Sequence, residues 1–318
     1  MNAIRIVQTW LLPALLVIEF VVFTALSPHF LTAPNLINVG VNAADLALIA
    51  AGLTVVILMG GIDVSTGFAV GLLSWIVASL LSAGQPPIVV LIAALVGGTV
   101  VGLLNGVLTA RLAIPSIVAT LGTSALFQTV LFSLWNSKDI FSPPVFPFLS
   151  ATARVGGVPL LLILVVAVYV VLHAVLSRTR FGRSVYAVGS NLEAAKLSGI
   201  NVRRVRIAGS VILGVLLGLA ACTYLGRVGV VQASSGGELT ILAIASVVVG
   251  GTSILGGEGS VLRTLGGVVF INVLSNGIVL AGVPSIWNGL IVGFVILVAV
   301  SINGLAVLVR ARSRRSVS

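Results

Sequence analysis

The sequence predicts an all-α integral membrane protein, a polytopic bundle of about ten transmembrane segments with both termini in the cytoplasm. Of its 318 residues, 58% are apolar and 8% are charged, whereas soluble domains carry about a quarter charged residues. The apolar residues form blocks that approach the roughly 20 residues a helix needs to cross a bilayer. Stretches such as 160–172 and 291–300 do not alternate between apolar and polar residues, which excludes a membrane β-barrel.

Ten segments bounded by Pro, Gly, Asn or charged residues are expected within a single domain, 1–318. The first, Trp10 to Leu26, follows Arg5 like a signal peptide. It is long for a signal core, so we expect an uncleaved helix. The second to tenth segments are expected to begin near residues 44, 64, 88, 117, 158, 207, 239, 264 and 285. Gly, Ser and Thr dilute the segments near 64 and 117, which makes both candidates for broken or re-entrant helices.

The basic residues determine the orientation of these segments. With ten spans and a cytoplasmic amino end, 14 of the 17 Lys and Arg residues lie in cytoplasmic loops, and Lys138, Arg154 and Arg227 lie outside. This bias places both termini in the cytoplasm. It also accounts for the net charge of +10 without a nucleic-acid partner.

Two loops are large. The extracytoplasmic loop, 135–158, is rich in Pro and Phe, so it either contacts a partner or caps the bundle; its members, with the Pro just after it, are Phe141, Pro143, Pro144, Phe146, Pro147, Phe148 and Pro159. The cytoplasmic loop, 177–206, holds seven basic residues. Within it Asn191 is expected to cap a short helix, Leu192 to Leu197, with Glu193 in its first turn and Gly199 just beyond its end.

Several classes of chemistry lack their residues. A phosphate-binding loop needs Gly-Lys-Ser or Gly-Lys-Thr, and neither Lys138 nor Lys196 has that context. One cysteine and two widely separated histidines give no disulfide or local metal motif. Among the acidic residues, Glu19 alone lies within an expected span. It either contacts a proton or solute, or it pairs with a neighbouring helix or reaches the interface.

Two glycine-rich breaks interrupt the apolar pattern, one at Gly60 to Gly67 and one at Gly250 to Gly259. The first is either a tight turn with helix-capping Asp63 or a broken helix that lines a cavity. The pair weakly suggests an internal repeat. Uncharged polar residues within the spans either form a path for a polyhydroxylated solute or bond helices together; they are Asn105, Thr120, Thr123, Gln128, Asn272, Ser275, Asn276 and Asn288.

The cytoplasmic loop carries a family resemblance. The motifs Phe181-Gly182-Arg183, Gly189-Ser190-Asn191 and Glu193-Ala194-Ala195 through Gly199-Ile200 resemble the coupling helix of the ribose-type permeases of ATP-binding-cassette importers. Three further matches follow the family's order; they are Gly60-Gly61-Ile62-Asp63, Thr120-Leu121-Gly122-Thr123 and Val249-Gly250-Gly251-Thr252 with Gly256-Gly257. Together the matches run from about residue 40 to 305.

The resemblance implies a permease subunit in a bacterial inner membrane. It implies two permease copies or paralogues around a central path, a periplasmic solute-binding protein, and a cytoplasmic subunit that binds ATP and magnesium, so that this chain binds no cofactor and is no enzyme. The residues it assigns to ATPase coupling are Gly189, Ser190, Asn191, Glu193, Ala194, Ala195, Gly199 and Ile200.

The family transports pentoses, hexoses, rhamnose and autoinducer 2. The stretches Leu16 to Glu19 and Ala281 to Pro284 are similar to the autoinducer-2 permeases, which makes that solute one possibility beside pentoses and rhamnose. An ion-coupled secondary sugar transporter is the alternative, and it would need more carboxylates within the spans than Glu19. A membrane-embedded enzyme would need a convergent set of His, Asp or Cys, which the sequence lacks.

Overall fold

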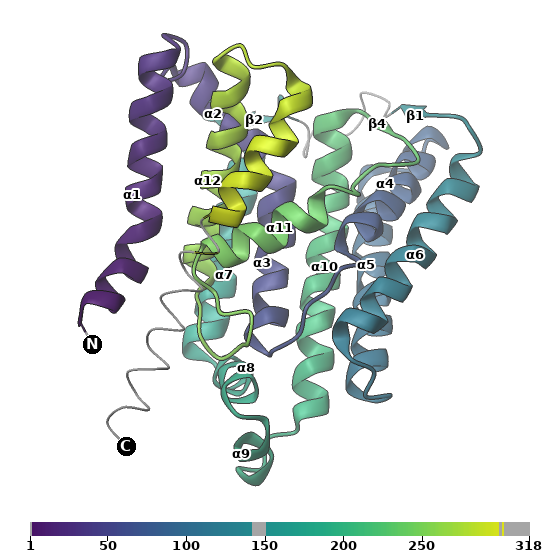
Figure 1. Ribbon diagram of the computed structural model, residues 1–318. Coiled ribbons are helices and arrows are strands. Elements are labelled where there is room, and N and C mark those ends of the chain that lie inside the picture. The colour runs from purple at the N-terminus through teal and green to yellow at the C-terminus, as the bar shows by residue number, and fades with distance from the viewer. Residues whose placement is uncertain (1, 142–150, 299–300, 302–318) are drawn as a thin grey trace.

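The computed structural model (Figure 1) describes residues 2–141, 151–298 and 301. Pro143, Pro144, Phe146, Pro147 and Phe148 of the predicted outer loop lie outside the described residues, as does the basic tail 310–315.

Helices make up most of the described chain. They are α1 (Asn2–Leu26), α2 (Ala33–Asn42), α3 (Ala44–Leu58), α4 (Thr66–Ser82), α5 (Pro87–Ala110), α6 (Ser116–Trp135), α7 (Leu160–Arg178), α8 (Arg180–Ser190), α9 (Leu192–Leu197), α10 (Val202–Val228), α11 (Leu239–Val249), α12 (Val261–Leu280), the 3-10 turn η1 (Ser285–Trp287) and a last helix, Asn288–Val298. Short strands form two antiparallel pairs; they are β1 (Ile140–Phe141) with β4 (Val230–Val231) and β2 (Arg154–Val155) with β3 (Val158–Pro159).

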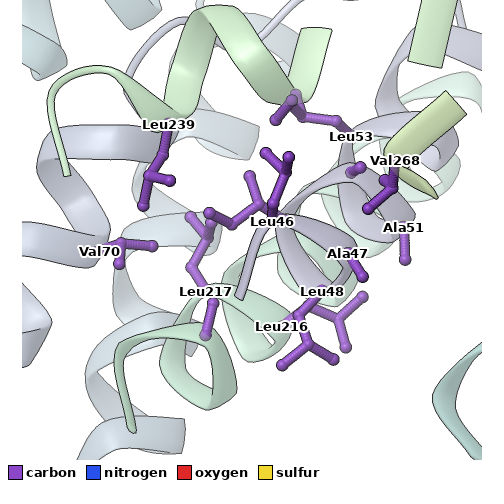
Figure 2. Close-up of a cluster of buried hydrophobic side chains, with 14 of the residues drawn as sticks. Leu46, Ala47, Leu48, Ala51, Leu53, Val70, Leu216, Leu217, Leu239 and Val268 are labelled. Atoms are coloured by element: carbon purple, nitrogen blue, oxygen red, sulfur yellow. The ribbon is translucent and has the colours of Figure 1, made fainter. Parts of the chain in front are cut away.

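Helix α3 is the centre of the bundle. All of its residues are buried, as expected for a helix that is apolar on every side. In Figure 2 the side chains of Leu46 and Leu53 lie among residues from four other helices; these are Val70 of α4, Leu216 and Leu217 of α10, Leu239 of α11 and Val268 of α12. A displacement of α3 would therefore disturb its packing against α4, α10, α11 and α12.

Helices α5 and α10 pack through small residues. A Cβ atom on Gly98 would overlap the Gly214 carbonyl, and one on Gly214 would overlap the Gly98 carbonyl. Gly102 meets the backbone at Ser210 in the same way. Residues spaced four apart thus let the two backbones touch, which is a common way to join helices in a membrane.

The predicted helical membrane fold is confirmed, and each of the ten expected segments overlaps a helix. Five described helices are long and apolar enough to cross a bilayer, and α2 with α3, bent by 46°, forms a sixth candidate. The 11 residues of α11 reach about 17 Å, short of the roughly 30 Å hydrocarbon core. The segment near 117 is a continuous helix of 20 residues, whereas the one near 64 follows a genuine helix break.

The two ends of the bundle differ. Helices α8 and α9 project from one end, and β1 with β4 lies at the other (Figure 1). The predicted cytoplasmic loop contains one more helix than expected, because α8 precedes α9. Helix α8 begins after Thr179, whose hydroxyl accepts a 3.1 Å hydrogen bond from the Gly182 amide, as an N-cap residue does.

Candidate translocation site and coupling loop

The chain between α3 and α4 lacks helical structure from Gly61 to Ser65, and side chains from α6 replace the missing backbone partners. The Ile62 amide donates a 3.1 Å hydrogen bond to Ser116 Oγ, and the Val64 amide donates a 3.1 Å bond to Thr120 Oγ1. Non-helical backbone at membrane depth needs such partners because lipid provides none. Of the two interpretations of this segment, the structure therefore supports the broken helix.

A buried carboxylate ties the break to α5. Asp63, 4% exposed, accepts hydrogen bonds at Oδ1 from the Ser65 amide (2.9 Å) and hydroxyl (2.6 Å), and at Oδ2 from Asn105 Nδ2 (2.9 Å). Asn105 Nδ2 also lies 2.8 Å from Ser65 Oγ. A buried carboxylate is tolerated when its lone pairs are used in this way.

The start of α4 is anchored by α11, since Thr240 Oγ1 accepts a 2.8 Å hydrogen bond from the Gly67 amide.

One cavity borders the broken segment, and a second one borders the first turn of α4. The α9-side cavity, about 580 Å³, lies between Gly60–Asp63, the end of α5, the start of α6, α9 and the start of α10. The β4-side cavity, about 610 Å³, is lined by α4, α6, α10 and residues 232–238. Asp63 lines the first cavity and Phe68 the second. Ser65, Thr66 and Gly67, which lie between these two residues in the chain, are buried and line neither cavity.

The structure divides the predicted polar residues into two groups. Asn105 and Thr120 line the α9-side cavity, and Gln128 lines the β4-side cavity. Thr123 is buried between them along α6, and its hydroxyl donates to the Thr120 carbonyl (3.3 Å). Helix α6 thus presents polar residues to both cavities, Ser116 included.

The polar residues of α12 line neither cavity. Asn276 exchanges hydrogen bonds of 2.9 and 3.0 Å with Asn35 of α2, which is the helix-bonding role that was the alternative. Asn272 donates to the Val268 carbonyl within its own helix (3.0 Å), and Ser275 lies in the same helix. Asn288, in the last helix, is likewise absent from both cavity walls.

Glu19 of α1 is 7% exposed, and within the described residues neither of its carboxylate oxygens has a hydrogen-bond partner. It lines neither cavity.

The loop 177–206, to which the family resemblance assigns ATPase coupling and which we call the coupling loop, contains the predicted short helix. In α9, Asn191 Oδ1 accepts a 3.0 Å bond from the Ala194 amide, Glu193 pairs with Lys196 at 2.7 Å, and Gly199 has a φ of 78°. The structure also shows that Leu197, the last residue of α9, is 90% exposed. The sequence gives no sign of that exposure, because an apolar residue at a helix end is more often buried.

Helix α8 packs on the end of α3. The Gly257 amide donates a 2.9 Å bond to the Leu58 carbonyl, and the Tyr186 hydroxyl donates a 3.1 Å bond to the Gly259 carbonyl. A Cβ on Gly189 would overlap the Leu58 carbonyl oxygen and crowd the Gly257 amide. We call these five residues the glycine junction. The glycine junction joins the coupling loop, the glycine-rich loop before α12 and the end of α3. Partial burial of Tyr186 at this junction raises the pKa of its hydroxyl group.

Comparisons with known proteins identify the family of this chain. Residues 35–300 match the family described as "branched-chain amino acid transport system / permease component". The chain belongs to this permease family. The permease is 35% identical to the autoinducer 2 import system permease protein LsrC of Salmonella typhi, over 90% of this chain and 82% of that one. It is 36% identical to the ribose import permease protein RbsC of Bacillus subtilis, over 91% and 90%.

No solved structure was found to match the permease. The predicted resemblance to ribose-type permeases is nevertheless confirmed by these relatives, which are permease subunits of ABC-type importers of ribose and autoinducer 2 and are not themselves enzymes. The permease is accordingly a transport subunit rather than an enzyme.

Proposed function

We propose that the permease moves a monosaccharide or sugar-like solute into the cytoplasm through the broken segment between α3 and α4, driven by ATP hydrolysis on a separate subunit. One observation carries this proposal. In the glycine junction, Gly189 of the coupling loop packs against the Leu58 carbonyl, and the broken segment begins three residues later at Gly61. A movement of α8 and α9 would therefore reach the segment that borders the α9-side cavity.

The orientation follows from charge and geometry. We propose about ten membrane crossings, with α8 and α9 in the cytoplasm beside both termini. The described start of α1 lies toward the same end as α8 and α9 (Figure 1), in agreement with an even number of crossings between them. Arg227 is near the opposite end, together with Arg154 of β2, where few basic residues are expected.

The partners are a cytoplasmic ATP-binding subunit that holds ATP and magnesium, a periplasmic solute-binding protein, and a second permease copy or paralogue in a bacterial inner membrane. Helix α9 is the proposed contact with the ATPase subunit, since Leu197 and the Glu193–Lys196 pair face solvent there. An exposed leucine of this kind suits an apolar groove on a partner.

The solute belongs to the class that the relatives' names give, ribose or autoinducer 2, with rhamnose and other pentoses as neighbours in chemistry. Uncharged Asn, Thr and Gln side chains at both cavities offer hydrogen bonds to hydroxyl groups without capturing an ion.

Purification of the tagged permease from its native membrane, followed by uptake assays in proteoliposomes, tests the proposal. We expect an ATPase subunit to co-purify, and labelled ribose or autoinducer 2 to enter only with ATP and the binding protein. Uptake that ignores ATP and follows a proton or sodium gradient would instead support the secondary-transporter alternative.

A further inference from the structure

The α9-side cavity has a strongly basic mouth. Four cationic side chains from three different elements line it; they are Arg111 after α5, Lys196 of α9, and Arg203 and Arg206 of α10. Asp63 is the acidic residue that lines it, and its oxygens are occupied by Ser65 and Asn105. A cytoplasmic excess of Arg accounts for basic loops, but it does not require that they converge on one cavity.

The arginines there have no side-chain partner among the described residues. Within the part of the chain that the structure describes, Arg111, Arg203 and Arg206 make no side-chain hydrogen bond or ion pair, whereas Arg227 is paired with Asp45. Lys196 alone is neutralised, by Glu193. An unpaired guanidinium has its full set of donors available, and its geometry fits the oxygens of a phosphate group in a two-point contact.

Two long helices begin at this cavity. Ser116 opens the 20-residue α6 and Val202 opens the 27-residue α10, and both residues line its wall. Free amides and the helix dipole at such ends favour an anion, which adds to the charge of the side chains.

The deeper wall offers neutral hydrogen-bonding groups. Asn105 is 2% exposed, and its Oδ1 has no partner within the described residues. The Ser116 hydroxyl accepts from the Ile62 amide and keeps its own proton to donate. The volume of about 580 Å³ lies within the roughly 300–1,000 Å³ of small-molecule sites.

We propose that the α9-side cavity binds a phosphate-bearing ligand, with its phosphate at Arg111, Arg203 and Arg206 and any hydroxyl groups toward Asn105. Two sources share this chemistry, a soluble phosphorylated sugar and the headgroup of an anionic phospholipid. Either ligand would occupy the space beside Gly60–Asp63 and hold the broken segment in this conformation. Binding of this ligand does not require ATP-driven transport, so the proposed site can be tested separately from the proposed function.

Equilibrium dialysis on the full-length chain in phosphatidylcholine nanodiscs tests the site. We expect labelled ribose 5-phosphate to bind and ribose to bind at least tenfold more weakly, with the difference shrinking as salt is raised. The double variant Arg203→Gln, Arg206→Gln should bind ribose 5-phosphate at least tenfold more weakly. The control Arg178→Gln, Arg180→Gln has the same change in net charge in the same loop but removes no residue of the cavity, and it should bind like the unmodified chain.

A second arm separates the two sources. If a lipid fills the site, native mass spectrometry will show phosphatidylglycerol retained by the unmodified chain and lost from the Arg203, Arg206 glutamine variant, and nanodiscs containing that lipid will suppress binding of ribose 5-phosphate. The double variant Arg203→Lys, Arg206→Lys keeps the positive charges and is the control for misfolding of the glutamine variant. It should retain part of the binding of ribose 5-phosphate. Equal binding of both ligands by the unmodified chain and the glutamine variant would overturn the proposal.

Discussion

The carbonyl of Leu58, the last residue of α3, accepts a 2.9 Å hydrogen bond from the amide of Gly257, which lies in the loop before α12. Gly189 of the coupling loop packs against the same carbonyl, where a Cβ atom would overlap it. Three segments far apart in sequence thus meet at the point where the central helix ends and the broken segment begins.

Gly189→Ala should uncouple the transporter. The added methyl group forces the backbones of α8 and Leu58 apart, so the ATPase subunit should still bind and hydrolyse ATP while solute uptake falls at least tenfold. ATP hydrolysis and uptake are measured on the same proteoliposomes. Gly293→Ala is the control, because a Cβ there meets no atom within 4 Å. Normal uptake by Gly189→Ala would contradict a mechanical role for the junction.

Glu193→Arg should abolish ATP-coupled uptake while the protein still inserts in the membrane. Glu193 and Lys196 form an exposed pair at 2.7 Å, and such pairs contribute little to stability. The loss should therefore come from the partner contact. Adding Lys196→Glu to Glu193→Arg restores a pair of opposite charges within the helix. If uptake recovers in that double variant, the pair serves helix stability and not docking.

Asn105→Ala should destabilise the fold by about 1–3 kcal/mol, because a buried carboxylate loses a donor. The donor is Nδ2, which bonds Asp63 Oδ2 at 2.9 Å. Thermal unfolding in detergent measures the change, and the control is Thr129→Ala on the exposed face of α6, where an effect within about 0.5 kcal/mol is expected. Equal effects of the two substitutions would mean that the cluster around Asp63 contributes nothing to stability.

Arg227→Gln should be more damaging than Asp45→Asn. The two side chains form a 2.7 Å ion pair in which Asp45 is 1% exposed and Arg227 is 24% exposed. Removing the arginine leaves a buried, uncompensated carboxylate, at a cost of about 3 kcal/mol or more. Removing the aspartate leaves an arginine that reaches solvent. The free energies of unfolding of the unmodified chain, the two single variants and the double variant form a double-mutant cycle. Additive effects of the two substitutions would show that the pair is not coupled.

Asp139→Asn should remove a pH dependence at the β4 end of the bundle. Hydrogen bonds from Trp135 Nε1 (2.8 Å) and Gln232 Nε2 (3.1 Å) hold the pKa of Asp139 below its ordinary value. A lowered folded-state pKa stabilises the fold fully above the ordinary value of about 3.9, and this contribution is lost as the pH falls through the folded-state pKa.

The melting temperature measured between pH 2.5 and 7 checks this expectation. The melting temperature of the unmodified chain should exceed that of Asp139→Asn above about pH 5, where an aspartate with a lowered pKa is ionised, and the difference should shrink as the pH falls. The control Lys138→Gln, one residue away, should follow the unmodified chain. A difference between the unmodified chain and Asp139→Asn that stays constant with pH would contradict the assignment.

Local patterns predicted α9 and the helices of the ten apolar segments, but neither α2 nor α8. Apolar blocks placed all ten expected segments on helices, and Asn191 and Gly199 defined the ends of α9, because caps and glycine turns depend on a few neighbouring residues. Helix α8 was missed. With 11 residues and several polar ones among its apolar positions, it does not stand out as an apolar block, and its packing on α3 depends on contacts between distant segments.

The candidate site was only partly predictable. The break at Gly60 to Gly67 was visible as glycine, but its two meanings could be separated only once Ser116 and Thr120 were seen to complete its backbone bonds. The polar residues of α5, α6 and α12 had looked equivalent along the chain. Their division into a group at the cavities and a group in α12, of which Asn276 bonds to α2, depends on which way each helix faces, and a helix apolar on most sides does not reveal that in its sequence.

The sequence by itself determined a helical membrane protein of the permease family, the uneven distribution of its basic residues, and the capped helix α9. Each of these follows from composition or from residues close together in the chain. Only the tertiary structure decided that Leu58, Gly189 and Gly257 meet, that Asp63 is held by Asn105, and that four basic side chains face one cavity. These are contacts between distant segments, and they depend on how helices of similar apolar character pack against one another.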